Sequence, residues 1–467
     1  MNIENFLNKI RDKSIHIVGV SGAEGSSILR LLISHKIDNI KTHDFEDKNK
    51  LEKSFKLWHK GISVGERNKL FKRFLNDLSK TTFYSGKDYL RNILSADIIF
   101  VPQSWRLYKE QNQILYEAKK RNISFYSLTR LYLDFSRAKV IGVTGTVGKG
   151  STANILVNAL KIKYKNVYFA GNESWMVQLI DKISMMKKED ILVLEISHRQ
   201  LQDGFTRAPN IAVFTNIYPN HLDEVSWNDY KRLKFSLALE QKENDITVLN
   251  YDFPELRSIV GKLKSKVFYY SIKNQKMNTK NIHKYYSLIM NSKNTHYKEN
   301  ILAAATVIDL LDIKIETFLE TLKNIQALPA RNQLVAKVSE IRFFNDIKST
   351  TPWATLAAVR KLGKSCILIC GGRTKGINYQ HFVEKIKNEV KFIIFLKSEL
   401  SDNLKKLIPH DSYKIFTDLR KAILFAYQKA EKGDNILISP AAGFFYSDFI
   451  QGKESIRKIV TSLPLKE

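Results

Sequence analysis

A short apolar segment followed by a glycine-containing turn occurs three times in this chain, and no other feature constrains the fold as strongly. The apolar segments are 14–20, 139–144 and 366–370, and the turns that follow them are 21–25, 145–149 and 371–375. Helical patterns follow the first two turns, as far as Ile33 and Leu160. Because strand, glycine turn and helix in succession open a unit of an α/β layer, the sequence predicts an α/β protein.

Further apolar segments alternate with helical patterns along the rest of the chain. They are 96–101, 191–196, 211–216, 245–250, 392–395 and 435–439. This alternation favours mostly parallel sheets. A length of 467 residues exceeds one ordinary core and fits two to four domains. We place boundaries near Arg137 and near Leu328, which predicts domains of residues 1–137, 138–328 and 329–467.

The composition of the chain indicates in which compartment of the cell the protein is expected. It has no apolar run of membrane-spanning length, and its first 13 residues lack the apolar block of a secretory signal. The two cysteines, Cys366 and Cys370, lie too far apart along one expected strand to form a disulfide easily. We therefore expect a cytoplasmic protein without membrane insertion.

The formal net charge of +28 has two interpretations. Nucleic-acid or anionic-membrane contact is one; a lysine-rich composition with an anionic substrate is the other. The lysines are spread along the whole chain, which favours the second interpretation and no nucleic-acid partner. The basic helical stretch 56–80 is expected to be an exposed insertion and has no functional explanation from sequence.

The turn after the second apolar segment is the strongest single motif. Its small residues allow backbone amides to approach phosphate oxygens at a helix N-terminus, and Lys149 would reach the β- and γ-phosphates. Gly150 takes the place where a metal-binding hydroxyl normally stands. A plain glycine-rich turn is the alternative. The expected ATP-binding residues here are Gly145, Thr146, Val147, Gly148, Lys149, Gly150 and Ser151.

Two polar groups follow later strands. Glu195 ends the segment 191–195, and His221 lies in the sequence Asn-His-Leu-Asp at 220–223. Ligands bind at the carboxyl ends of strands in open α/β sheets. A carboxylate and an imidazole, together with phosphate oxygens, suit Mg²⁺ or Mn²⁺. Either group alone is more often ordinary polar surface.

These motifs, in this order, resemble the ATP-dependent Mur ligases of peptidoglycan synthesis. Residues 194–201 read Leu-Glu-Ile-Ser-His-Arg-Gln-Leu and match at five of eight positions the Leu-Glu-Leu-Ser-Ser-Phe-Gln-Leu of members that add D-glutamate. Further segments matching in family order are 145–152, 220–223, 230–234, 296–300, 328–331, 345–350, 371–375 and 439–441. The resemblance covers nearly the whole chain.

The resemblance implies three domains: a Rossmann-like domain that binds UDP, a central ATPase domain and a C-terminal Rossmann-like domain. It implies a monomer in which the carboxylate of UDP-N-acetylmuramoyl-L-alanine attacks the γ-phosphate of ATP. The amine of D-glutamate would then attack the acyl phosphate, giving an amide, ADP and phosphate, in a pathway tied to cell shape and division. Such chemistry depends on neutralising phosphate charge.

The resemblance also implies residue roles. Lys149 would stabilise the transferring phosphoryl group, and Lys234, as a carbamate, would join Glu195, His221 and Ser151 at the metals. Without the resemblance, Lys234 would be an ordinary surface or salt-bridge lysine. The remaining expected nucleotide contacts are Asn300, Arg331 and Asp346. The expected substrate contacts are Asp44, Gly86, Asn172, Ser197, Gln200, Lys348, Thr350 and Lys375.

The chain also departs from the family pattern. Gly150 replaces a hydroxyl residue, Asn220 replaces an aspartate, and a serine expected soon after Pro440 is missing, with Ser447 further on. Two alternatives therefore stay open: a related ligase with another amino-acid acceptor, such as the folylpolyglutamate synthetases, and a catalytically weakened nucleotide-binding protein. A basic phosphate-loop protein acting on nucleic acid is a more distant alternative.

Overall fold

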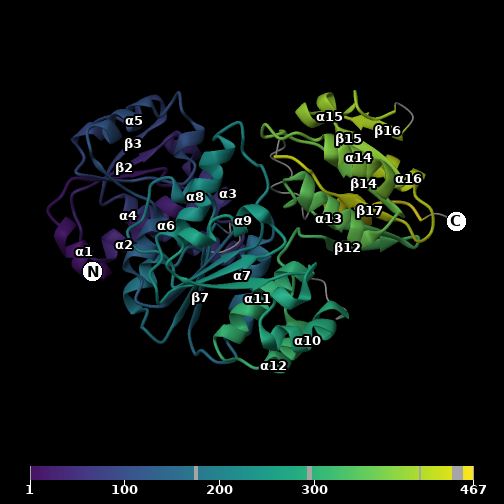
Figure 1. Ribbon diagram of the computed structural model, residues 1–467. Coiled ribbons are helices and arrows are strands. Elements are labelled where there is room, and N and C mark those ends of the chain that lie inside the picture. Colours follow the sequence, from purple (N-terminus) through teal and green to yellow (C-terminus); the bar gives the residue numbers. More distant parts are fainter. Residues whose placement is uncertain (1, 173–176, 292–296, 410–411, 444–455, 466–467) are drawn as a thin grey trace. The chain divides into compact units, whose positions relative to one another are not determined.

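The computed structural model describes residues 2–172, 177–291, 297–409, 412–443 and 456–465, and it contains three sheets (Figure 1). The strand orders are β3-β2-β1-β4-β5, β11-β10-β9-β6-β8-β7 and β12-β13-β17-β14-β15-β16. Within the described ranges, all named strand pairs are parallel except β12 with β13. The predicted α/β fold with mostly parallel sheets is confirmed.

The first sheet and its helices come from the N-terminal part of the chain. The strands are β1 (Ile15–Val18), β2 (Ile40–Asp44), β3 (Thr82–Ser85), β4 (Ile98–Phe100) and β5 (Ser124–Tyr126). The helices are α1 (Ile3–Ile10), α2 (Ala23–Ser34), α3 (Leu51–Trp58), α4 (Val64–Leu78), α5 (Gln113–Lys120) and α6 (Leu128–Phe135).

The second sheet carries the glycine loop. Its strands are β6 (Lys139–Thr144), β7 (Val167–Gly171), β8 (Ile191–Glu195), β9 (Ile211–Phe214), β10 (Ile246–Asn250) and β11 (Lys266–Tyr270). The helices of this part are α7 (Lys149–Leu160), α8 (Trp227–Leu239), α9 (Pro254–Arg257), α10 (Lys280–Asn291), α11 (Lys298–Leu310) and α12 (Ile315–Asn324). Helices α7, α11 and α12 bury apolar faces in the same core as strands β6, β8 and β9.

The third sheet lies in the C-terminal part. Its strands are β12 (Gln333–Val338), β13 (Ile341–Asn345), β14 (Cys366–Cys370), β15 (Phe392–Leu396), β16 (Tyr413–Phe416) and β17 (Asn435–Ile438). Its helices are α13 (Pro352–Leu362), α14 (Gln380–Glu389), α15 (Glu399–Leu404) and α16 (Leu419–Lys429). Both cysteines are buried thiols on β14.

The chain forms two compact units. One combines residues 1–217 with 231–325 and holds the first two sheets, and the other combines 218–230 with 326–467 and holds the third sheet. The domain limits at residues 137 and 328 stay a prediction.

A buried carboxylate ties the first two sheets into one unit. Asp203, which follows the second sheet's strand β8, accepts two hydrogen bonds from Arg106 (2.7 and 2.9 Å) and pairs with Lys119 at 3.0 Å. Trp105 Nε1 donates a further bond to it at 3.2 Å. Burial opposes the charge of Asp203, but the bonds and charges of Arg106 and Lys119 hold its pKa below the usual value. The Asp203 carboxylate therefore stays ionised at neutral pH and holds Trp105 of the first sheet's part against the loop that follows β8.

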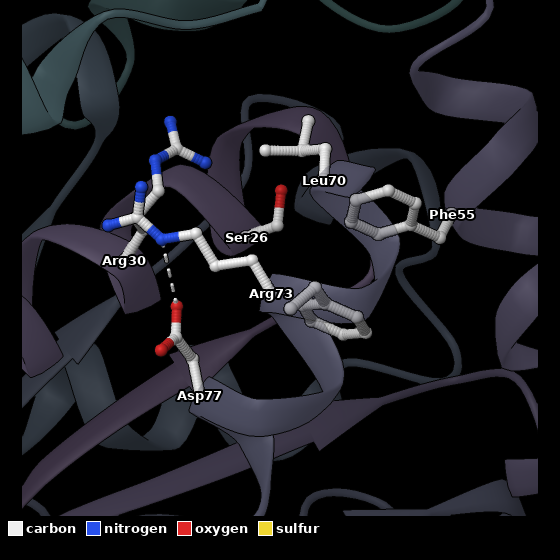
Figure 2. A pocket seen from close by; sticks show the side chains of 7 residues that line it. Ser26, Arg30, Phe55, Leu70, Arg73 and Asp77 are labelled. Carbon is white, nitrogen blue, oxygen red and sulfur yellow. Dashed lines mark ion pairs between the residues drawn. The ribbon is translucent and has the colours of Figure 1, made fainter. Parts of the chain in front are cut away.

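Helices α3 and α4 form a hairpin that packs on α2. Phe55 stacks on His59 with ring centroids 3.9 Å apart and on Phe74 at 4.9 Å, and Ser26 of α2 hydrogen-bonds His59 at 3.2 Å. Figure 2 shows Phe55 and Arg73 beside the pocket at this junction. The helical part of the prediction for 56–80 is confirmed, and its inner face is buried.

Two buried histidines on neighbouring strands make the first sheet sensitive to acid. His16 of β1 and His43 of β2 are fully buried, with Nδ1 of His16 and Nε2 of His43 2.9 Å apart. Burial lowers the pKa of His16 to about 3, helped by His43 and Lys41. Burial also lowers the pKa of His43 to about 4, against the opposing bond to the Tyr89 carbonyl. Both rings therefore stay neutral in the folded protein where an unfolded histidine would be protonated.

The sign of the resulting pH dependence follows from linkage. In the folded protein the pKa values of His16 and His43 lie below 6.5, the value of an unperturbed histidine. The stability that depends on their neutral rings is therefore fully present above pH 6.5 and is lost as the pH falls toward 4. Each neutral histidine costs about 1.4 kcal/mol per pH unit in that window. The free energy of unfolding of the wild type should fall between pH 6.5 and 5. In His43→Asn this fall should be smaller, by about 1.4 kcal/mol per pH unit, as measured by urea unfolding. Parallel pH profiles for the two proteins would contradict the assignment.

Candidate active site

The glycine loop connects β6 to α7 and requires backbone conformations that favour glycine. Gly145 has φ +143° and Gly148 has φ +86°, and Gly148 is the residue before the first turn of α7. A Cβ at Gly145 would overlap the Thr215 hydroxyl, and one at Gly148 would overlap the side-chain oxygen of Asn300. The loop therefore leaves room for backbone only, as a site for phosphate oxygens requires.

Asn216, which sequence reasoning missed, holds the first half of the loop. Its Oδ1 accepts hydrogen bonds from the amides of Thr146 (3.2 Å) and Val147 (2.8 Å), and its Nδ2 donates to the Val147 carbonyl at 2.9 Å. Since these two amides are engaged, the amides of the first turn of α7 are the better phosphate donors. One sequence signal marks Asn216: it lies two residues after β9, and therefore at the carboxyl edge of the sheet.

Lys149, at the start of α7, points its ammonium group back over the loop. Its Nζ donates to the Thr146 carbonyl at 3.1 Å. Ser151 follows on the same turn and is half-buried, and Gly150 is buried. The charge of Lys149 also acts on Lys234, so the two side chains lie in one electrostatic neighbourhood.

Lys234 is buried inside the site and not on the surface. Its side chain is 1% exposed, and Nζ donates to the Gly145 carbonyl at 2.8 Å. Burial lowers the pKa of Lys234 well below its usual value, the charge of Lys149 lowers it further, and Glu195 opposes both. Burial thus favours the neutral amine, which is the form able to add carbon dioxide, so the predicted carbamate fits this environment. The alternative of a surface lysine is excluded.

Glu195 ends β8 with an incompletely satisfied carboxylate. Its Oε1 accepts from Asn172 Nδ2 at 3.0 Å, and the Asn172 amide donates to the Glu195 carbonyl at 2.9 Å. Its Oε2 is buried and has no hydrogen-bond partner among the described residues. A buried carboxylate oxygen without a partner is costly, and a cation would satisfy it. Glu195 beside the glycine loop and Lys234 therefore fits a divalent metal.

Ser197 and Gln200 form a small network that reaches the first sheet. The Ser197 amide donates to Gln200 Oε1 at 2.8 Å, and the Ser197 hydroxyl donates to Gln103 Oε1 at 2.9 Å. The amide of Gln103 in turn donates to Glu24 of α2 at 2.7 Å. Because α2 begins just after the first glycine turn, this network links the two expected substrate-binding segments. Gln103 and Glu24 carried no recognisable sequence signal.

Asp44 and Gly86 lie at the carboxyl edge of the first sheet. Asp44 is buried and accepts from the Ser21 amide at 2.8 Å, which fixes the first glycine turn. Gly86 has φ +75°. Two exposed aromatic residues, Phe45 and Tyr108, were not predicted as site residues from the sequence. Phe45 directly follows Asp44 in the chain, and its ring stacks with that of Tyr108, with 6.2 Å between the ring centroids. Exposed parallel rings offer a stacking surface for a planar base.

Three of the expected substrate contacts, Lys348, Thr350 and Lys375, lie in the second unit. Lys375, in a left-handed conformation (φ +57°), donates to the Thr350 carbonyl at 3.0 Å and to its hydroxyl at 3.1 Å. Lys348 and Thr350 precede the N-terminus of α13, which Thr351 caps. A lysine and a helix N-terminus together suit a carboxylate ligand.

Asp346 is buried in the same unit and acts on the loop before β12. It accepts from the Asn332 amide and from the Ser439 hydroxyl, both at 2.8 Å. Burial raises the pKa of Asp346 to about 6, against these bonds and the charge of Arg331. The carboxylate thus fixes the backbone beside Arg331, and direct contact of either residue with a nucleotide stays a prediction.

His221 lies in the segment 218–230 of the second unit, with a left-handed backbone (φ +58°). Its Nδ1 lies 2.9 Å from a carboxylate oxygen of Glu224, a residue that sequence reasoning missed. A carboxylate on one ring nitrogen is the usual way in which a metal-binding histidine is oriented. Ser447, the distant serine after Pro440, lies outside the described residues.

The tight approach of Asn300 to Gly148 gives a testable expectation. Gly148→Ala would place a methyl group on Asn300 and force a left-handed conformation that costs about 1 kcal/mol or more. We expect at least a tenfold loss of ATP affinity by calorimetry, with little change in the melting temperature. Gly65→Ala is the matched control, since nothing lies within 4 Å of a Cβ there. Equal affinities for the two variants would contradict the role of the loop.

The parallel sheet, the glycine loop at a helix N-terminus and the buried lysine and glutamate beside it define the class: a phosphate-loop α/β protein. Comparison with known families narrows this class. Residues 143–308 match the Mur ligase middle domain, and residues 330–442 match the Mur ligase, glutamate ligase domain. Together the two matches span more than half of the chain, and the protein belongs to the Mur ligase family.

Individual relatives agree with this placement. The UDP-N-acetylmuramoylalanine--D-glutamate ligase of Thermoanaerobacter sp. is 28% identical, over 97% of this chain and 99% of the relative. The UDP-N-acetylmuramate-alanine ligase of Thermotoga maritima has the same fold, with a TM-score of 0.58 at 13% identity over 96% of this chain and 99% of that one. A folylpolyglutamate synthase/dihydrofolate synthase from Yersinia pestis, solved with AMPPNP and a Mn ion, has a TM-score of 0.50 at 16% identity over 71% and 91% of the two chains.

Proposed function

We propose that this protein is an ATP-dependent ligase that joins D-glutamate to UDP-N-acetylmuramoyl-L-alanine, a step of peptidoglycan precursor synthesis. The names of its full-length relatives support the substrates. The observation that carries the chemistry is the buried Lys234, with its amine on the Gly145 carbonyl beside Lys149 and Glu195. A buried lysine on α8 whose amine lies against the phosphate loop meets no structural need that an apolar residue would not meet better.

In the proposed reaction, the carboxylate of the muramoyl-alanine attacks the γ-phosphorus of ATP, and the bond to the bridging oxygen breaks to release ADP. The amine of D-glutamate then attacks the acyl carbon, loses a proton and expels phosphate. Lys149 and the first-turn amides of α7 would offset the charge on the transferring oxygens. Ser197, Gln200 and Asn172 would position the carboxylate, and Lys348, Thr350 and Lys375 would hold D-glutamate.

A divalent metal, Mg²⁺ or Mn²⁺, would bind beside the phosphate groups of ATP. Glu195, Ser151, His221 and carbamylated Lys234 would hold it, and bound there it would neutralise the phosphate oxygens. The buried Oε2 of Glu195 supports this proposal. The similar structure from Yersinia pestis was solved with AMPPNP and a Mn ion, which supports a divalent metal together with the nucleotide.

The first sheet would bind the uridine diphosphate end of the substrate. The first glycine turn and the start of α2 would face the phosphates, as in other α/β crevices. Phe45 and Tyr108 would stack on the base, with Asp44 and Gly86 at the ribose or base edge. We further propose a cytoplasmic monomer that serves cell-wall synthesis, and thereby cell shape and division.

The test is phosphate release from ATP with Mg²⁺ and UDP-N-acetylmuramoyl-L-alanine, adding one amino acid at a time. We expect release with D-glutamate, together with the matching amide product by mass spectrometry. Release only with another amino acid would keep the ligase reaction and change the acceptor. Binding of ATP without release in any mixture would favour a weakened homologue, consistent with Gly150 and Asn220.

A further inference from the structure

The α3–α4 hairpin is a firmly folded element whose function the proposed reaction does not explain. Phe55 stacks on Phe74 inside the hairpin, with ring centroids 4.9 Å apart. A 3.2 Å hydrogen bond between His59 and Ser26 fixes the hairpin to α2. A 2.8 Å bond between the hydroxyls of Ser54 and Ser21 fixes it to the glycine turn before α2. A capping box at Ser63 and Glu66 starts α4 after a turn of five residues. The turn between the helices therefore has a defined position relative to the first sheet.

The turn end of the hairpin exposes large apolar side chains. Trp58, the last residue of α3, is 49% exposed, Leu57 is 38% exposed, and Val64, the first residue of α4, is 63% exposed. Further along the outer side of α4, Leu75 is 44% exposed. Single exposed apolar residues are common, but a tryptophan and two aliphatic residues at one tip are typical of an interaction surface.

Positive charge is concentrated along the two helices of the hairpin and the residues that flank them. Residues 48–80 contain ten lysines and arginines against three acidic residues, about twice the density of basic residues in the whole chain. Lys53 lies one turn before Leu57 on α3, and Lys72 lies one turn before Leu75 on α4, so cations and apolar side chains share faces of their helices. Lys53, Lys69 and Lys72 are exposed.

From this combination we infer that the hairpin tip, residues 57–64 with the basic residues of α3 and α4, binds an anionic lipid bilayer surface. Tryptophan and leucine favour the headgroup boundary, and lysines favour acidic headgroups. A nucleic acid would match the charge but not the aliphatic side chains. Among the helices of the described part of the chain, none is long and apolar enough to span a bilayer.

Sedimentation of the full-length protein with vesicles tests this inference. We expect binding to vesicles of phosphatidylglycerol and phosphatidylcholine, little binding to phosphatidylcholine alone, and a loss at high salt. Leu57→Ser with Trp58→Ser, and separately Lys69→Glu with Lys72→Glu, should each lower the partition coefficient at least about tenfold. Phosphate release should be unchanged in both variants.

Matched controls separate a specific tip from the overall charge of +28. Leu334→Ser with Leu407→Ser removes two exposed apolar residues, and Lys385→Glu with Lys387→Glu makes the same charge change on α14. These controls should bind vesicles like the wild type. No vesicle binding, or equal losses in tip and control variants, would overturn the inference, and selective binding to DNA or to another protein through the tip would replace it.

Discussion

Replacing Lys149 with alanine should lower phosphate release at saturating substrates by about a thousandfold. The side chain starts α7 and lies over the glycine loop, where it can follow charge as the γ-phosphoryl group moves from ADP to the carboxylate. The loss should appear in kcat, because the interaction strengthens as the transition state forms. Single-turnover release of labelled phosphate measures it directly.

The control for this variant is Lys161→Ala at the exposed C-terminal end of the same helix. It removes an equal charge and should retain wild-type turnover. Both variants should melt like the wild type, since each of these lysines lies at an end of α7 and outside the apolar core of the second sheet. Substantial turnover by Lys149→Ala would refute the assigned role.

Replacing Lys234 with alanine should lower turnover by about a hundredfold or more, and formate or acetate should restore part of it. The reason is that the wild-type side chain is buried with a strongly lowered pKa, the condition for carrying a carbamate at neutral pH. A small carboxylate could occupy the vacated space and supply the missing negative charge. The measurement is turnover against formate concentration.

Methylamine distinguishes the two chemical forms of Lys234. Rescue by methylamine and not by formate would mean that the amine itself acts, which would contradict the carbamate. Lys242→Ala, an exposed lysine just after α8, is the matched control and should respond to neither additive. Depleting carbon dioxide should lower wild-type turnover only if the carbamate forms.

The sequence predicted the parts of the fold with strong local signals. The glycine turns, the long apolar strands of the sheet centres and helix α7 all carry periodic or positional patterns that need no partner. The β12–β13 hairpin did not, because Ser339 and Glu340 adopt positive φ in its two-residue turn, where asparagine and glycine are the usual signal. The edge strand β3 was missed for another reason: its residues are exposed or half-buried, so its sequence has no apolar run.

At the site, residue identity was predictable and environment was not. The resemblance selected Lys234 and Glu195, but the burial of the amine and the unpartnered oxygen depend on tertiary packing. Asn216 and Glu224 act through a neighbour, holding the loop and orienting His221. A residue that acts through another leaves no motif of its own in a single sequence.

The most direct test of the proposed ligase chemistry follows one oxygen atom. UDP-N-acetylmuramoyl-L-alanine labelled with ¹⁸O in its carboxylate is incubated with the protein, ATP, Mg²⁺ and D-glutamate, and the released phosphate is analysed by mass spectrometry. If the carboxylate attacks the γ-phosphorus, each phosphate formed with an amide carries one ¹⁸O. Unlabelled phosphate accompanying amide formation would contradict activation of the carboxylate by ATP and, with it, the central claim.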